Sequence, residues 1–142
     1  MAVMVFTDGK FLIGTSSSPT DLSDHVRSMT INYKAEIQDR TAMSSSARRR
    51  IPGLKDWDAS VEFNQDFAAS KVDATFWPLI GSTAKYCQFR PNSSASTAVN
   101  PRYVGHFVVE SYSPVAGSVG DLLTVTVALT GDGLLHRYTS AT

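Results

Sequence analysis

The stretch Leu54–Phe67, LKDWDASVEFNQDF, decides the fold, because apolar and polar residues alternate along it. Its apolar positions are Trp57, Ala59, Val61 and Phe63. Its polar positions are Asp58, Ser60, Glu62 and Asn64. A period of two places these two sets on opposite faces of a β-strand. We therefore predict a strand that buries one face in a core and presents a polar face outward.

Further strands are predicted on both sides of this stretch. Residues 29–37 alternate in the same way, with Met29, Ile31, Tyr33, Ala35 and Ile37 on one side and Thr30, Asn32, Lys34 and Glu36 on the other. Asp121–Thr130 places Leu123, Val125, Val127 and Leu129 inward and Thr124, Thr126 and Thr130 outward. Shorter strands are expected over Phe11–Gly14, Lys85–Arg90, Tyr103–Tyr112 and Leu134–Tyr138. In Tyr103–Tyr112 apolar residues on both faces predict burial of both.

One segment, Ala68–Ile80, has a helical period instead. Val72, Phe76, Leu79 and Ile80 lie on one stripe, which predicts an amphipathic helix of about three turns that ends near Pro78. The fold class is therefore mainly β, an antiparallel β-sandwich or barrel with one flanking α-helix. Its predicted core includes Trp57, Val61, Phe63, Phe76, Leu79, Val125 and Val127.

The segment from residue 41 to residue 53 interrupts the alternation between two long strands. It combines a serine-rich run with Arg48, Arg49 and Arg50, and it closes on Pro52-Gly53. We expect it to project from the body as a hairpin-like loop, and long ordered loops tend to be functional. Three interpretations of the arginines are open: contact with a neighbouring subunit, contact with nucleic acid, or a solvated loop.

Composition bounds the function. The 142 residues predict a single domain, 1–142, and 13 Lys plus Arg balance 13 Asp plus Glu. A dedicated nucleic-acid binder normally has a basic excess, which this chain lacks. Zero net charge removes the repulsion that keeps copies apart.

The three histidines lack the spacing of a metal site, and His25 beside Asp21 and Asp24 is interpreted as a solvated turn. No serine sits in an activating motif, so we expect neither enzyme activity nor a cofactor.

We also expect no targeting signal in this sequence. The N-terminal residues MAVMVFTDGK do not resemble a secretory signal, and no run is long and apolar enough for a membrane span. The single cysteine, Cys87, is interpreted as a small hydrophobic residue of a strand. We expect synthesis and assembly in a cytoplasm, with no membrane partner.

Five motifs, in order, resemble the major tail tube proteins of long-tailed bacteriophages with non-contractile tails. The resemblance runs from about Leu22 to Gly133, about four fifths of the chain. The motifs are DLSDHVRS (Asp21–Ser28), ARRRIPGLKDW (Ala47–Trp57), SVEFNQDF (Ser60–Phe67), VDATFWPL (Val72–Leu79) and GSVGD (Gly117–Asp121). Each motif alone is unspecific, and their order carries the resemblance.

The resemblance implies a virion protein that self-assembles into stacked hexameric rings, which form the hollow tail tube through which DNA passes. It implies partners in the tape measure, tail terminator and tail tip proteins, and weak, transient contact with phage DNA. The N-terminal arm 1–20 and the loop 41–53 are the expected assembly elements, with contacts through Phe11, Leu12, Arg48, Arg49, Arg50 and Ile51. Exposed strand edges would pair between neighbours in a ring. The residues expected to line the lumen or an inter-subunit surface are Thr30, Asn32, Lys34, Glu36, Asp58, Ser60, Glu62, Asn64, Thr124 and Thr126.

Other functions compete with this interpretation. The runner-up is another virion protein on a similar sandwich, such as a capsid decoration or tail-completion protein. A serine hydrolase and a cellular ligand-binding module are the alternatives from other classes.

Overall fold

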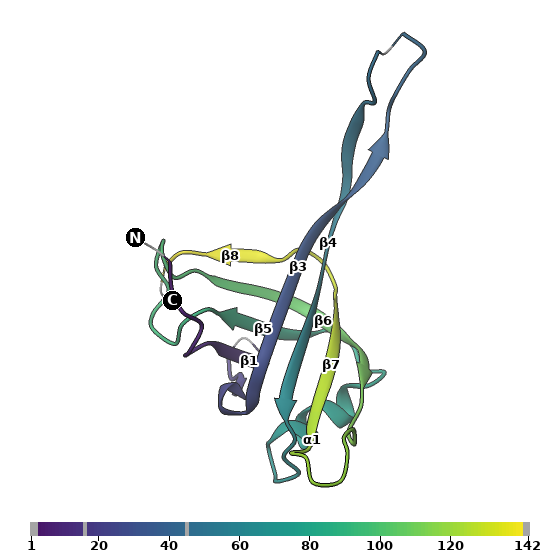
Figure 1. Ribbon diagram of the computed structural model, residues 1–142. Helices are drawn as coiled ribbons and strands as arrows, with labels where there is room; N and C mark the ends of the chain where they lie inside the picture. Colours follow the sequence, from purple (N-terminus) through teal and green to yellow (C-terminus); the bar gives the residue numbers. More distant parts are fainter. Residues whose placement is uncertain (1–2, 16, 45, 141–142) are drawn as a thin grey trace.

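A computed structural model describes residues 3–15, 17–44 and 46–140 of the chain (Figure 1). Residues 1, 2 and 16 of the predicted N-terminal arm, residue 45 of the predicted loop and residues 141–142 lie outside the described residues. The strands are β1 (Lys10–Gly14), β2 (Thr20–Asp21), β3 (Val26–Asp39), β4 (Arg50–Asn64), β5 (Lys85–Arg90), β6 (Arg102–Tyr112), β7 (Thr124–Gly131) and β8 (His136–Tyr138). The helical segments are η1 (Ser23–His25), α1 (Val72–Phe76) and η2 (Trp77–Leu79). The predicted mainly antiparallel fold with one short flanking helix is confirmed.

The described strands form one antiparallel sheet that folds over on itself. Its order is β2-β1-β5-β6-β7-β4-β3, and β8 pairs with β6. Strands β3, β4 and β7 cross in front of β1, β5, β6 and β8 at a steep angle (Figure 1). Strand β6 belongs to both layers, because it pairs with β5 through its first half and with β7 through its second. Its register shifts between Val109 and Ser111, and such bulges let a strand bend from one layer into the other.

The core lies between the two layers and is rich in aromatic rings. The ring centroids of Phe11 and Phe89 are 5.1 Å apart, and those of Phe63 and Phe76 are 5.2 Å apart. Six of the seven predicted core residues are buried: Trp57, Val61, Phe63, Phe76, Val125 and Val127. Leu79 is only partly buried and packs against the edge of the cluster, because it lies in η2 beyond the end of α1.

Strand β4 differs from its prediction at both ends. It begins at Arg50 because pairing with β3 continues outward to the Asp39–Arg50 pair. The register shifts between Ala35 and Ile37, opposite Pro52-Gly53, so the hairpin accommodates a proline that a regular ladder would exclude. The strand ends at Asn64, and Asp66 then accepts a hydrogen bond from the backbone N–H of Ala68 in a turn.

The predicted three-turn helix is much shorter. The helix α1 has five residues and continues as the 3₁₀ segment η2. Ser70 has a left-handed backbone, with φ of 62°, so a right-handed helix cannot include it. Pro78 lies in the 3₁₀ turn, where it has no N–H to give to an α-helical ladder. Within the described residues, no helix is long and apolar enough to cross a bilayer.

The predicted burial of both faces of Tyr103–Tyr112 holds at Val104, which is buried, and is wrong from His106 onward. Phe107 and Val109 face the core, whereas His106 and Val108 are exposed on the outer face. The short edge strand β8 covers only the first residues of β6, from Arg102 to Val104. There the guanidinium of Arg102 lies 4.7 Å from the ring centroid of Tyr138, a cation–π contact that joins the two strands.

Trp57 packs directly against the backbone of two glycines. A Cβ atom built on Gly131 would lie 2.3 Å from Nε1 of Trp57, and one on Gly105 would lie 2.8 Å from its Cζ2. These distances are far below van der Waals contact, so only glycine leaves room for the indole. Because Gly131 ends β7 and Gly105 lies in β6, this contact ties β4 to both layers.

We predict that Gly131→Ala lowers the free energy of unfolding by about 1–3 kcal/mol, because the added methyl group displaces a fully buried ring. Gly53→Ala is the matched control, since its Cβ would meet the nearest atom at 3.4 Å. Urea unfolding of the two variants measures the difference. Equal stability of both variants would contradict the packing role of Gly131.

Candidate functional site

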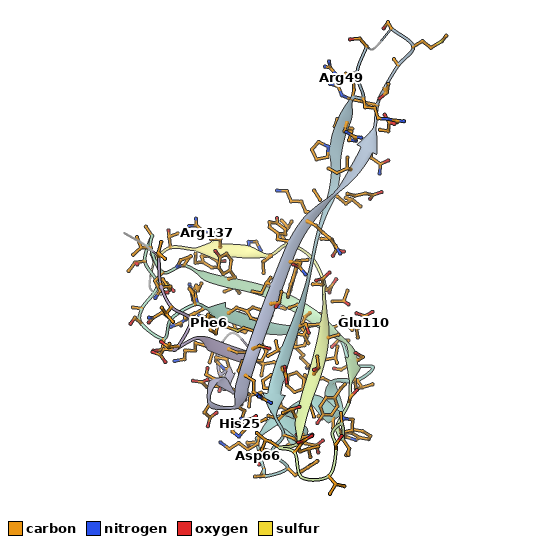
Figure 2. All side chains as sticks on the ribbon, viewed as in Figure 1. Phe6, His25, Arg49, Asp66, Glu110 and Arg137 are labelled. Atoms are coloured by element: carbon orange, nitrogen blue, oxygen red, sulfur yellow. The ribbon has the colours of Figure 1, made fainter. Side chains whose placement is uncertain are left out.

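The hairpin of β3 and β4 projects from the body of the protein. Trp57 is the first buried residue of β4, and every residue from Arg50 to Asp56 is exposed. Figures 1 and 2 show the two strands continuing well beyond the layers, with Arg49 near the tip. The projection expected from the sequence is thus present, but much of it is strand rather than loop.

The tip of the hairpin carries a concentrated positive charge. Arg40, Arg48, Arg49 and Arg50 lie beside a single carboxylate, Asp39, for a net charge of +3 over residues 39–51. A guanidinium N–H of Arg48 donates to Asp39 at 3.1 Å, and the backbone N–H of Thr41 donates to the same carboxylate at 2.9 Å. The hydrogen bonds from Thr41, and then that from Arg48, lower the pKa of Asp39. Among the described residues, Arg49 and Arg50 have no carboxylate within ion-pair distance.

Apolar side chains are exposed along the same hairpin. Leu54 is 79% exposed, Ile37 is 57% exposed and Ile51 is 49% exposed. Isolated exposed apolar residues are common, but these lie near one another along two paired strands. Ile37 pairs with Pro52 and Ile51 with Gln38, so the two isoleucines are on opposite faces of the hairpin. The hairpin therefore has both the charge and the apolar area that a contact with another macromolecule requires.

The outer face of β3, β4 and β7 is a continuous polar surface. The pairs Thr30–Ser60 and Asn32–Asp58 join β3 to β4, and Glu62–Thr126 and Asn64–Thr124 join β4 to β7. All ten polar residues expected to line a lumen or an inter-subunit surface belong to these strands: Thr30, Asn32, Lys34, Glu36, Asp58, Ser60, Glu62, Asn64, Thr124 and Thr126. The register places them on one side of the sheet, opposite the core.

Carboxylates outnumber cations on this polar face. Nζ of Lys34 lies 3.0 Å from Asp58, and a guanidinium nitrogen of Arg27 lies 3.7 Å from Glu62. The hydrogen bond from Lys34, and then that from Asn32, lowers the pKa of Asp58. The five acids Glu36, Asp56, Asp58, Glu62 and Glu110 face only these two cations, which gives a net charge of −3. The residues predicted for this face from sequence already have a net charge of −2, from Glu36, Asp58 and Glu62 against Lys34. The structure adds Asp56, Glu110 of β6 and Arg27 of a bulge.

The prediction that Phe11 and Leu12 contact a neighbouring subunit is wrong. Phe11 is fully buried and Leu12 is 9% exposed. Both belong to β1, where Phe11 packs on Phe63 and Phe89 in the core. Their apolar character therefore serves the fold of this chain. Arg48, Arg49, Arg50 and Ile51 are all exposed on the hairpin.

His25 forms a clamp that the sequence did not reveal. Its Nδ1 lies 2.8 Å from Asp24 and its Nε2 lies 2.8 Å from Asp66, and its side chain is only 15% exposed. The interpretation of His25 as part of a solvated turn with Asp21 and Asp24 is therefore wrong. Asp24 is one partner of His25, and the second partner, Asp66, comes from the segment after β4. Burial lowers the pKa of His25, but the hydrogen bonds to Asp66 and Asp24 outweigh it, so the pKa is raised. The clamp ties the start of β3 to the end of β4.

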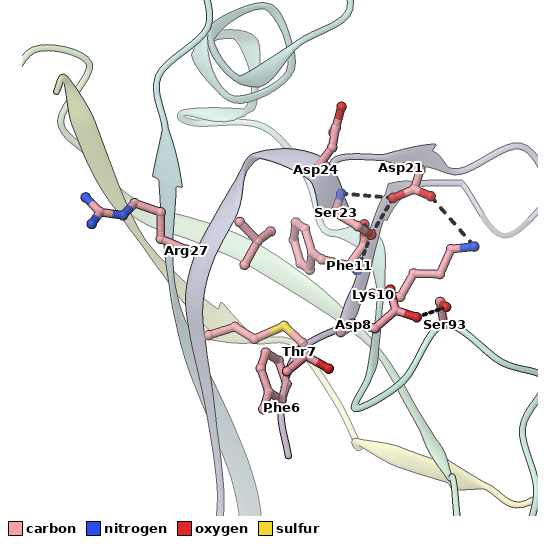
Figure 3. A pocket seen from close by; sticks show the side chains of 13 residues that line it. Phe6, Thr7, Asp8, Lys10, Phe11, Asp21, Ser23, Asp24, Arg27 and Ser93 are labelled. Carbon is pink, nitrogen blue, oxygen red and sulfur yellow. Dashed lines mark hydrogen bonds and ion pairs between the residues drawn. The ribbon is translucent and has the colours of Figure 1, made fainter. Parts of the chain in front are cut away.

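A cavity of about 560 Å³ lies between the N-terminal segment, β1 and the start of β3 (Figure 3). Phe6, Phe11 and Met29 supply its apolar wall. Asp21 is bonded to Lys10 and Ser23, and Asp8 is bonded to Ser93. Because these carboxylates are already engaged by neighbours within the chain, we assign no chemical step to this cavity.

The described residues outside this cavity give little support for a catalytic or metal-binding site. In the part of the chain that the structure describes, no three His, Cys, Asp or Glu side chains gather as metal ligands would. Burial raises the pKa of Cys87 to about 12, so its thiol stays protonated at neutral pH. The surfaces that stand out are the hairpin and the polar face.

Comparison with known proteins gives relatives by structure only. No family model matches the chain, and no curated protein matches it. A chain from the tail of an empty gene transfer agent particle, refined with C6 symmetry, superimposes with a TM-score of 0.74 at 18% identity, over 97% of this chain and 100% of that one. The SPP1 tail tube gives a TM-score of 0.75 at 10% identity, over 99% and 81%. The sheath–tube complex of an extracellular contractile injection system gives 0.66 at 8% identity, over 96% and 91%.

The chain therefore has the fold of tail tube proteins. The similarity extends over nearly its whole length and over most of each matched chain. The fold that the resemblance implied is confirmed. With identities below 20%, the comparisons do not transfer residue roles, and those rest on the geometry above.

The His25 clamp predicts a pH-dependent stability. A raised folded-state pKa stabilises the native protein below the unfolded-state pKa of 6.5, and this contribution is lost as the pH rises through the folded-state pKa. We expect His25→Gln to destabilise the protein most below pH 6.5 and progressively less above it. Thermal or urea unfolding of both proteins across this range measures the change. His136→Gln is the control, since this exposed histidine has no carboxylate within ion-pair distance among the described residues. A destabilisation by His25→Gln that is constant with pH would contradict the clamp.

Proposed function

We propose that this chain is the structural subunit of a tail tube, which self-assembles into stacked rings of six around a lumen for DNA. The observation that carries the proposal is the match of its fold, end to end, to a chain from a tail refined with C6 symmetry. The role is structural rather than catalytic, in a virion tail assembled in the cytoplasm of a bacterial host. Tape measure, tail terminator and tail tip proteins are the proposed further partners.

The free edge of β3 supports assembly through strand pairing. This strand has 14 residues and lies at one end of the sheet order. An edge of that length presents unpaired backbone groups, which natural proteins cover or guard. In a closed ring, an edge strand of the neighbouring copy would cover it, and the contact would repeat around the ring.

The charge of the polar face supports its assignment to the lumen. DNA passes through a conduit more readily when the wall does not bind phosphates, since phosphate neutralisation supplies most non-specific affinity. Together with Glu110 of β6, the face of β3, β4 and β7 has a net charge of −3, and its described cations are Lys34 and Arg27, each paired with a carboxylate. Lining the lumen with this face would keep DNA hydrated and mobile.

The alternative is another virion protein with the same fold, such as a capsid decoration or tail-completion protein. Negative-stain microscopy of the purified chain separates the two, because a tube subunit should form long hollow tubes. A protein that stays monomeric at high concentration would favour the alternative.

We predict that replacing Arg48, Arg49 and Arg50 with alanine stops tube formation while circular dichroism stays unchanged. The three side chains are exposed on the hairpin and contribute no buried contact to the fold. Electron microscopy and sedimentation measure assembly. Lys85→Ala/Arg137→Ala is a control that removes cations outside the hairpin and should form tubes. Normal tubes from the triple variant would show that the hairpin arginines are not needed.

We also predict that the chain binds DNA only weakly, with a dissociation constant above about 1 μM at physiological salt. The acidic polar face repels phosphates, and the arginine tip would be engaged in protein contacts. Fluorescence anisotropy with a labelled duplex measures the affinity of assembled tubes. Sub-micromolar binding would rule out a passive lumen.

A further inference from the structure

An apolar surface covers the end of the molecule opposite the hairpin. It is formed by Phe67, Val115, Val119 and Leu122, which are 59%, 75%, 106% and 66% exposed, and we call it the end face. Gln65 holds its loops together, because its backbone N–H donates to Leu123 at 3.0 Å and its side chain donates to Pro114 at 2.8 Å. Figure 1 shows these loops beside α1, at the far end of β4 from the tip.

Acidic residues surround the end face. Asp121 is next to Leu122, Asp66 is next to Phe67, and Asp24 reaches the same region through the His25 clamp. With Asp73 and Lys71 from the adjoining helix start, four carboxylates oppose one lysine, for a net charge of −3 with His25 neutral. Asp24 and Asp66 also bond His25, and Asp73 accepts a hydrogen bond from Tyr112. Among the described residues, Asp121 has no ion-pair partner.

The hairpin tip has the complementary character. Its net charge over residues 39–51 is +3, and its apolar side chains include Met43, which is 106% exposed, and Ile51. Arg49 and Arg50 lack carboxylate partners in the described part of the chain. A contact between the two surfaces would pair arginines with carboxylates around a centre of apolar side chains, the usual composition of a protein interface.

Geometry excludes this contact within one copy. The tip and the end face lie at opposite extremes of the molecule, joined by the long paired strands β3 and β4 (Figure 1). A contact between two different surfaces of identical copies is heterologous, and without closure it continues as an open stack. This is the arrangement needed along the axis of a tube.

We propose that the end face is the docking site for the hairpin tip of a copy in the adjacent ring. The inference rests on the proposed function and identifies the surface that receives the tip. Arg49 and Arg50 pair with the carboxylates around the end face, and the apolar residues of the two surfaces pack together. Contacts of this type weaken as salt rises, because the partly exposed charges are screened.

Charge reversal tests the docking pair in the full-length chain. Arg49→Glu/Arg50→Glu reverses the tip while leaving the Arg48–Asp39 bond in place. Val119→Lys/Asp121→Lys brings the net charge of the end face from −3 to 0 and places two lysines at exposed positions. We expect each double variant to lose tubes in negative-stain images and to lose the sedimenting fraction. The chain with all four substitutions should assemble again, because the glutamates of the tip then meet lysines at positions 119 and 121.

Two controls leave the charge and the apolar residues of both surfaces in place. Arg49→Lys/Arg50→Lys keeps the positive tip, and Lys85→Ala/Arg137→Ala changes neither surface, so both should still form tubes. Circular dichroism shows whether the fourfold variant folds. If it does not, a 1:1 mixture of the two double variants is the test of docking. In this mixture the tip of each variant can contact residues of opposite charge on the end face of the other variant. Rescue in either form supports the docking pair.

The outcomes separate this inference from the proposed function. Tubes from Val119→Lys/Asp121→Lys that match those of the unmodified chain would overturn the end face as receptor while leaving the tube function intact. Failure of rescue by both the folded fourfold variant and the mixture would do the same. An unmodified chain that never forms tubes, at any concentration or salt, would overturn the proposed function and the docking site together.

Discussion

The indole of Trp57 occupies the place where the two layers of the sheet meet and where the hairpin leaves the body. It is fully buried, and it lies against Gly105 and Gly131 so closely that neither position can carry a side chain. Tight packing of this kind fixes the relative position of three strands, because a core has no spare volume to absorb a shift. On one side of Trp57 the alternation of β4 builds a core, and on the other side no described residue of the chain covers the strand.

The same two strands therefore serve two purposes along their length. Over Trp57–Phe63 the apolar face of β4 stabilises the subunit, and over Arg50–Asp56 the strand is exposed on both faces. A hairpin that extends into solvent gains little from hydrophobic burial, and its ordering costs conformational entropy. A neighbouring copy that covers Ile37, Ile51 and Leu54 would recover that burial. The polar face beside them needs no cover, because its charged and hydroxyl groups remain hydrated.

The alternation of apolar and polar residues predicted the strands well. It predicted the roles of some single residues correctly and of others wrongly. Trp57, Val61 and Phe63 were assigned to the core correctly because a strand admits only two faces. Phe11 was misassigned as a contact residue because a short apolar run has the same composition in a core strand as in an exposed arm. The clamp of His25 with Asp66 was missed because its partners are 41 residues apart in the chain. The helix was too long in the prediction because a side-chain stripe does not reveal the left-handed backbone of Ser70.

The sequence by itself determined which elements form and which face of each is polar, since these follow from periods of two and from local breakers such as Pro78. It also indicated a projecting basic segment between two strands. Only the tertiary structure decided which charges share a surface. The structure adds Glu110 of β6 and Arg27 of a bulge to the polar face, and it forms the end face from loops near residues 67 and 120 that meet through Gln65. Such surfaces arise from long-range pairing, which no local pattern encodes.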